Sequence, residues 1–227
     1  MLVGDVLDGL TLLPGDRVLH IVDRTSVAPG GPQRRARAGA DVVQVGRATL
    51  GRSGDRLPFA DASFDVAVAH HTLEALSDRA WALSELRRVL TTSGRLAIEV
   101  WGPIDGNPAF SVLADSLQRR VGARAEAAVH WLASLSQPDD LRALLRVAGF
   151  EHLRVTRERT IVTVPSVAHL FGWLLGTFPI GAAIATLPSE ERMSIASDLA
   201  QGLGRLTDGI PFTTDVHSAA GAETTAA

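Results

Sequence analysis

The sequence predicts an α/β fold: a mostly parallel sheet with helices on both faces. Short apolar runs typical of strands recur along the chain, and segments with leucines spaced three or four apart lie between them. Strands that alternate with helices form βαβ units, whose parallel strands bind ligands at their carboxyl ends. The apolar fraction of 46% with 21% charged residues is that of a globular protein. We expect one domain over 1–218 and a flexible tail over 219–227.

Six apolar runs predict the strands. The first follows the turn Pro14-Gly15, and the third follows a turn-rich segment. The fifth is longer, and its second half alternates apolar with polar residues. The predicted strands are 17–22, 41–45, 64–69, 95–101, 153–164 and 210–216.

Helical periodicity fills the intervals between these strands. Residues 73–90 place their leucines on one face, and the segment Thr91 to Gly94 is expected to close that helix. Residues 138–148 begin with a proline and two aspartates, which favour a helix start. The remaining predicted helices are 3–13, 108–121 and 189–206, with a loosely helical apolar region before the last of them.

Charge and composition exclude several classes of function. The net charge is −3, and the only basic cluster, Arg34, Arg35 and Arg37, is too short for a nucleic-acid footprint. The most apolar stretch, 167–187, is interrupted by glycine, proline and histidine, so we expect no membrane span. The N-terminal segment lacks the basic leader of a signal peptide, which predicts a cytoplasmic protein.

The chain contains no cysteine, no tyrosine and no lysine, since all 22 basic residues counted as Lys or Arg are arginine. Thiolate nucleophiles, Schiff bases and cysteine metal sites are therefore excluded, and proton transfer falls to His, Asp, Glu or water. The histidine spacing predicts no metal, because no carboxylate can be placed beside the histidines from the sequence.

An ordered series of motifs runs through 57–110: an LPF turn, an SFD strand start, a helix ending in RRVL, and a strand running into VWGP. With LRALLRVAGFEHLRV further on, this series resembles the class I S-adenosylmethionine-dependent methyltransferases of the ubiquinone-biosynthesis-like group. The resemblance implies a Rossmann-like fold, a small-molecule substrate and S-adenosylmethionine as cofactor.

The first quarter departs from that family. Residues 20–26 stand where the family has a glycine-rich turn, and they contain no glycine. Only residues 24–40 lie between Asp23 and Asp41. This connection is too short for all the elements that the family has here, so we expect the loss of about one helix-strand unit. Arg47 replaces an acid that contacts adenine in the family. The sequence thus predicts that no cofactor is bound; if S-adenosylmethionine does bind, Asp23 and Asp55 are the expected replacements.

Candidate site residues follow the third and fourth strands. His70 and His71 are the expected proton-transfer groups, only one of them facing the cleft because strand residues alternate. Glu74 is expected to orient His70 or to favour the helix dipole. Three residues are expected to line a substrate pocket: Trp101, His130 and Trp131. For Trp101, a place in the packed core is an equally good explanation.

Three functions remain open from the sequence. The first is a cofactor-independent cyclase, isomerase or lyase that acts on a small hydrophobic molecule of secondary metabolism. The second is a working methyltransferase with a rebuilt pocket, which cofactor binding would reveal. The third is a non-catalytic partner of another enzyme, which a large exposed apolar patch around 167–187 would favour. The substrate and the oligomeric state, homodimer or complex, stay open.

Overall fold

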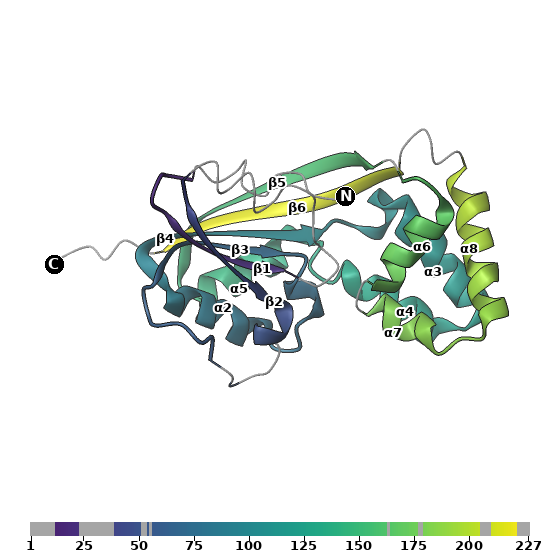
Figure 1. The fold of residues 1–227 in the computed structure, drawn as a ribbon, viewed down its shortest axis with the longest axis horizontal. Coiled ribbons are helices and arrows are strands. Elements are labelled where there is room, and N and C mark those ends of the chain that lie inside the picture. The colour runs from purple at the N-terminus through teal and green to yellow at the C-terminus, as the bar shows by residue number, and fades with distance from the viewer. Residues whose placement is uncertain are drawn as a thin grey trace. The chain divides into compact units, whose positions relative to one another are not determined.

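The computed structural model describes residues 12–22, 39–50, 54, 56–162, 164–176, 179–204 and 210–221. In this part of the chain six strands form one sheet in the order β2-β1-β3-β4-β6-β5 (Figure 1). The sheet, together with the helices between its strands, confirms the predicted α/β class. The strands are β1 (Arg17–Val22), β2 (Asp41–Gly46), β3 (Phe64–His70), β4 (Leu90–Trp101), β5 (Phe150–Val162) and β6 (Ile210–Gly221).

The centre of the sheet is parallel. Strand β1 pairs with β2 on one side and with β3 on the other, and β3 pairs with β4. The chain therefore steps from β1 outward to β2 and then returns across β1 to β3. Such a reversal is a topological switch point, and ligands bind outside the carboxyl ends of the strands there. At that end Val22 of β1 is aligned with Gly46 of β2 and with His70 of β3.

The helices differ from prediction in two places. Residues 73–90 do not form one helix: a short 3-10 turn η2 (Leu73–Ala75) precedes α2 (Arg79–Val89). The cause is Asp78, whose carboxylate accepts a hydrogen bond from the Trp81 N–H and caps α2. Helix α4 (Ala123–Leu132) was not predicted, because alanines occupy much of it and leave little contrast between its faces.

The other helical segments fall close to their predicted ranges. The loosely helical apolar region forms two helices, and the segment Thr91 to Gly94 belongs to β4 instead of closing a helix. The predicted helix at 3–13 lies almost wholly outside the described residues. The remaining elements are η1 (Arg47–Leu50), η3 (Ile104–Gly106), α3 (Pro108–Arg120), α5 (Pro138–Val147), α6 (Val167–Gly176), α7 (Ile180–Ala185) and α8 (Ser189–Leu203).

The chain groups into two compact units that interleave in sequence. The first comprises 1–100, 137–158 and 215–227, and the second comprises 101–136 and 159–214. The first unit carries the parallel strands, with Val18, Val66, Val68 and Ala97 forming a core cluster. The second contains α3, which packs against α4 and α8. Among the described helices none is long and apolar enough to cross a membrane.

A buried ion pair joins the LPF turn to α2. Glu85 accepts hydrogen bonds from the Leu57 N–H at 2.8 Å and from Arg88 through both of its oxygens, at 2.8 and 2.7 Å. Arg88 also donates to the carbonyl oxygens of Leu57 and Phe59 and to the Asp61 carboxylate. The spacing between the LPF and RRVL motifs therefore has a physical reason, because one guanidinium holds the turn that leads into β3.

Candidate functional site

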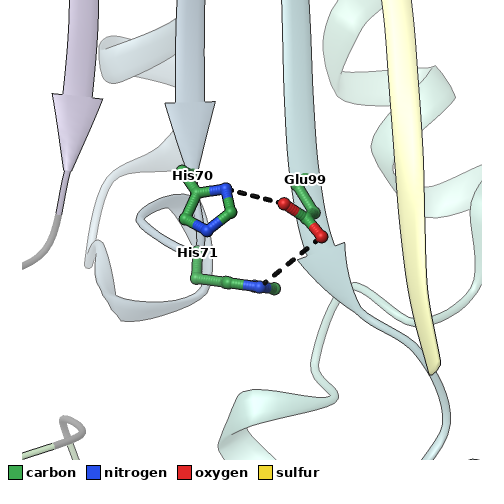
Figure 2. Close-up of side chains that lie close together, drawn as sticks. All are labelled: His70, His71 and Glu99. Atoms are coloured by element: carbon green, nitrogen blue, oxygen red, sulfur yellow. Dashed lines mark ion pairs between the residues drawn. The ribbon is translucent and has the colours of Figure 1, made fainter. Parts of the chain in front are cut away.

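A histidine and a glutamate face each other across β3 and β4 near their carboxyl ends. His70 is the last residue of β3, and the strand register aligns it with Glu99 of β4. The Nδ1 atom of His70 lies 2.6 Å from Oε2 of Glu99 (Figure 2). Both side chains are only 3% exposed. An imidazole and a carboxylate thus share a nearly dry environment beside the switch point.

His71 lies on the other side of the same carboxylate, with Nε2 at 3.8 Å from Oε1 of Glu99. Its φ of 46° is in the left-handed region, which is uncommon for a residue other than glycine. This conformation ends the strand alternation, and the His71 N–H donates to the Glu99 carbonyl at 3.0 Å. Both imidazoles therefore approach Glu99, whereas regular strand alternation would direct them to opposite faces of the sheet.

Glu74 lies beside His71. Its Oε1 lies 3.5 Å from Nδ1 of His71, and its side chain is 2% exposed. The Arg79 guanidinium donates to the carbonyl oxygens of Leu73 and Glu74, which holds the η2 turn against the start of α2. Burial lowers the pKa of Arg79, and the Glu74 carboxylate opposes that shift. A residue predicted at a helix start thus joins the site through a 3-10 turn.

Burial dominates the protonation of His71. Desolvation lowers the pKa of His71 to about 3; the Glu99 carboxylate opposes this shift and His70 adds to it. Because this value is far below 7, the His71 ring is neutral at physiological pH and keeps a lone pair on one nitrogen.

Two buried polar atoms at this edge have no hydrogen-bond partner among the described residues. They are Nε2 of His70 and Oγ1 of Thr72, which is fully buried. Unsatisfied buried polar atoms are rare in folded proteins, and a catalytic role or a bound water or ion is a common reason for them. The edge can therefore accept a hydrogen bond from a ligand, donate one, or coordinate an ion.

Sequence reasoning missed Glu99. The available signal was a single charged residue between Ile98 and Val100 in the apolar run 96–101. A carboxylate is rarely buried in such a strand without a partner. The missing information was the register, which only the folded sheet supplies.

The predicted pocket residues belong to the second unit. Trp101 is 3% exposed and packs edge-to-face on Phe110 and Trp173, with ring centroids at 5.0 and 6.0 Å. His130 is exposed and lies 3.3 Å from Glu126 on the same helix, and Trp131 is 44% exposed. Trp101 is thus a packed core residue of that unit. The predicted replacements Asp23 and Asp55, and the side chain of Arg47, lie outside the described residues.

Comparison with known proteins decides the family. The model of the methyltransferase domain matches residues 32–98. A demethylmenaquinone methyltransferase of Beutenbergia cavernae is 31% identical over 169 residues, which cover 63% of this chain and 69% of the relative. The chain belongs to the methyltransferase family. An O-methyltransferase, rstn1, of Aspergillus nomiae is 37% identical over 100 residues, 44% of this chain but only 40% of the fungal protein.

Solved methyltransferases share the fold. The phosphoethanolamine N-methyltransferase 2 of Haemonchus contortus, in complex with phosphomonomethylethanolamine and S-adenosylhomocysteine, aligns with 96% of this chain and 51% of its own at a TM-score of 0.54. Its sequence identity of 14% shows common fold alone. The same protein has also been solved with S-adenosyl-L-methionine, at a TM-score of 0.55.

These findings contradict the expectation that no cofactor is bound. The sequence relatives of this chain are named as methyltransferases, and the solved structure of similar fold holds S-adenosylmethionine or S-adenosylhomocysteine. The expectation treated a glycine-free turn, a shortened connection after Asp23 and the change to Arg47 together as a lost site. Yet β1, β2 and β3, whose carboxyl ends form the switch point, are all in place. The sheet edge at which such folds bind their ligands is therefore present despite these departures in sequence.

Proposed function

We propose that this chain is an S-adenosylmethionine-dependent methyltransferase with a rebuilt cofactor pocket, acting on a hydroxyl of a small hydrophobic molecule. The observation that carries the proposal is the position of His70, whose unpartnered Nε2 lies at the carboxyl end of β3 beside the switch point. A methyl acceptor with a hydroxyl group has a proton to lose, and an imidazole held by a carboxylate is a suitable acceptor for it.

The described residues at the switch point fit a polar cofactor. At the carboxyl end of β2, a Cβ placed on Gly46 would meet no heavy atom of the described residues within 4 Å. The hydroxyl of Thr72 is buried and has no hydrogen-bond partner among the described residues. Backbone at Val22 and Gly46, with Asp23 and Asp55 as expected from the sequence, would hold the cofactor. When bound, it supplies an activated methyl group.

His70 prepares the acceptor in this proposal. Glu99 holds the Nδ1 side of the ring at 2.6 Å, which leaves Nε2 to accept the hydroxyl proton. The positive charge that forms on the ring is stabilised by the Glu99 carboxylate, and the deprotonated oxygen is the stronger nucleophile. General-base catalysis of this kind contributes roughly 10²- to 10⁴-fold in rate.

Cofactor binding is the first test. Calorimetric titration of the chain with S-adenosylmethionine and S-adenosylhomocysteine should give one site per chain. Gly46→Phe should abolish this binding by filling the strand end, whereas Gly172→Phe, on a helix glycine with equally open surroundings, should leave it unchanged. Folded protein with no heat at about 1 mM ligand, a concentration far above ordinary cofactor affinities, would refute the proposal.

Methyl transfer is the second test. The chain is incubated with S-adenosylmethionine and a panel of small phenols and enols, and products one methyl heavier are detected by mass spectrometry. His70→Gln should lower kcat by at least about 100-fold with little change in cofactor affinity. The matched control is His169→Gln, because His169 is exposed and its ring contacts nearby Ser166. Equal turnover in both variants would remove His70 from the mechanism.

A further inference from the structure

The side chains of His70, His71 and Glu99 form a ligand set for a metal ion. One ligand atom from each lies within 4.8 Å of the other two. In a tetrahedral zinc site, bonds of about 2.0 to 2.2 Å place neighbouring ligand atoms roughly 3.4 Å apart. The observed separations of 2.6 Å from His70 to Glu99 and 3.8 Å from His71 to Glu99 bracket that value. Small side-chain adjustments within the cluster would bring the three ligand atoms to the separations of a zinc site.

We propose that His70, His71 and Glu99 bind one divalent transition-metal ion of the zinc class. Two imidazoles and one carboxylate are the protein ligands of catalytic zinc sites, which leave a further position open. Mg²⁺ and Ca²⁺ prefer all-oxygen ligands, so two imidazoles select against them. Nothing in the known relatives' names assigns a metal to these positions.

The second layer of contacts supports the same ion. Histidines that bind metals usually direct their other ring nitrogen to a carboxylate or carbonyl, which fixes the ring. His71 has this arrangement, with Nδ1 toward Glu74 at 3.5 Å and Nε2 toward Glu99. Arg79 holds the backbone of Glu74 in turn.

Backbone geometry also brings the ligands together. The positive φ of His71 turns the chain so that two successive residues reach one carboxylate, which a regular strand would not allow. Strained non-glycine residues of this kind cluster at ligand sites. The ring centroids of His70 and His71 are 4.6 Å apart, and Figure 2 shows both rings beside Glu99. His70 is nearly fully buried, and its Nε2 has no hydrogen-bond partner among the described residues.

This inference deepens the proposed function. Only the catalytic role of the ion rests on that function; the binding of the ion does not. An ion in this position would take over from His70 the task of lowering the pKa of the acceptor hydroxyl. Metal binding itself is measured without S-adenosylmethionine. Loss of cofactor binding and loss of metal binding are therefore separate results.

The test uses the untagged full chain, stripped with a chelator and titrated with Zn²⁺ by calorimetry and with Co²⁺ by visible absorption. We expect one ion per chain with a dissociation constant below about 1 µM, and Co²⁺ bands typical of four or five ligands. Glu99→Gln and His71→Gln should weaken binding by more than about 100-fold, and Glu74→Gln by about 10- to 100-fold. His169→Gln should bind as the unaltered chain does.

Two results would overturn the inference. One is folded protein, verified by circular dichroism, that takes up neither ion at about 1 mM. The other is binding that survives in Glu99→Gln unchanged, since the ion would then lie elsewhere. If Glu99→Gln does not fold, Glu74→Gln decides, because a purely structural Glu74 would alter the melting temperature without altering metal affinity.

Discussion

Replacing Arg88 by methionine should destabilise the fold by about 3 to 5 kcal/mol, the cost of leaving a buried charge without its partner. Arg88 donates two hydrogen bonds to Glu85, and the two side chains are only 14% and 4% exposed. Methionine retains much of the apolar stem but none of the donors. Glu85 would keep the Leu57 N–H and a distant, exposed Arg56 at 3.9 Å.

The loss of stability in Arg88→Met should also depend on pH. The hydrogen bond from Arg88 is the main cause that lowers the pKa of Glu85, against an opposing effect of burial. The folded pKa is therefore below the unfolded value of about 4.3, so the stabilisation is complete above that pH and is lost as the pH falls through the folded pKa. The stability difference between the unaltered chain and Arg88→Met should shrink in acid.

Urea unfolding followed by circular dichroism at pH 7 and in acid measures both effects. Arg88→Lys should lose less stability than Arg88→Met, because lysine keeps the positive charge although it cannot form the bidentate pair. Arg142→Met is the matched control, since Arg142 pairs with Asp139, which is 91% exposed, and should cost only about 0.5 kcal/mol. A loss below about 1 kcal/mol for Arg88→Met, or a loss independent of pH, would refute the argument.

Three more outcomes follow from other parts of the chain. Asp198→Asn should speed hydrogen exchange in α8 at neutral pH and have less effect in acid, because hydrogen bonds from Arg120 and Ser116 hold the pKa of Asp198 far below its usual value. Gly181→Ala should lower the melting temperature, since its Cβ would collide with the Leu175 carbonyl, while Gly172→Ala, in an open helix position, should raise it slightly. Arg47→Asp should strengthen S-adenosylmethionine binding about tenfold by calorimetry, since it restores the acid that the family resemblance expects there.

The elements best predicted from the sequence were those bounded by strong local signals. Strand β1 was predicted at its observed bounds, because the Pro14-Gly15 turn precedes a continuous apolar run. Helix α5 was predicted to within one residue from its proline, its aspartates and Gly149, whose φ is 82°. Strand β5 begins three residues before its predicted start and ends two before its predicted end, and β6 continues five residues beyond its predicted end, since strand pairing includes residues without a clear pattern.

The site was predicted in part. The two histidines were identified from their position after an apolar run, but their common partner Glu99 follows 28 residues after His71 and is brought there only by strand pairing. The split of the 73–90 segment depended on a capping contact of Asp78, which competes with the leucine periodicity. Contacts that depend on register or on a single backbone angle leave no periodic trace in a sequence.

The register that aligns His70 with Glu99 is set at the opposite end of β3 and β4. Phe64 is aligned with Leu90 and Val66 with Arg95, so β3 advances two residues while β4 advances five. The bulge between these pairs, which contains Gly94, absorbs the extra residues. A Cβ at Gly94 would come 2.9 Å from both the Leu90 Cβ and the Thr91 carbonyl oxygen, so this close turn requires glycine. A bulge shorter or longer by one residue would turn Glu99 to the other face of the sheet, away from His70. The segment Thr91 to Gly94, which was expected to close a helix, therefore sets which carboxylate meets the two histidines.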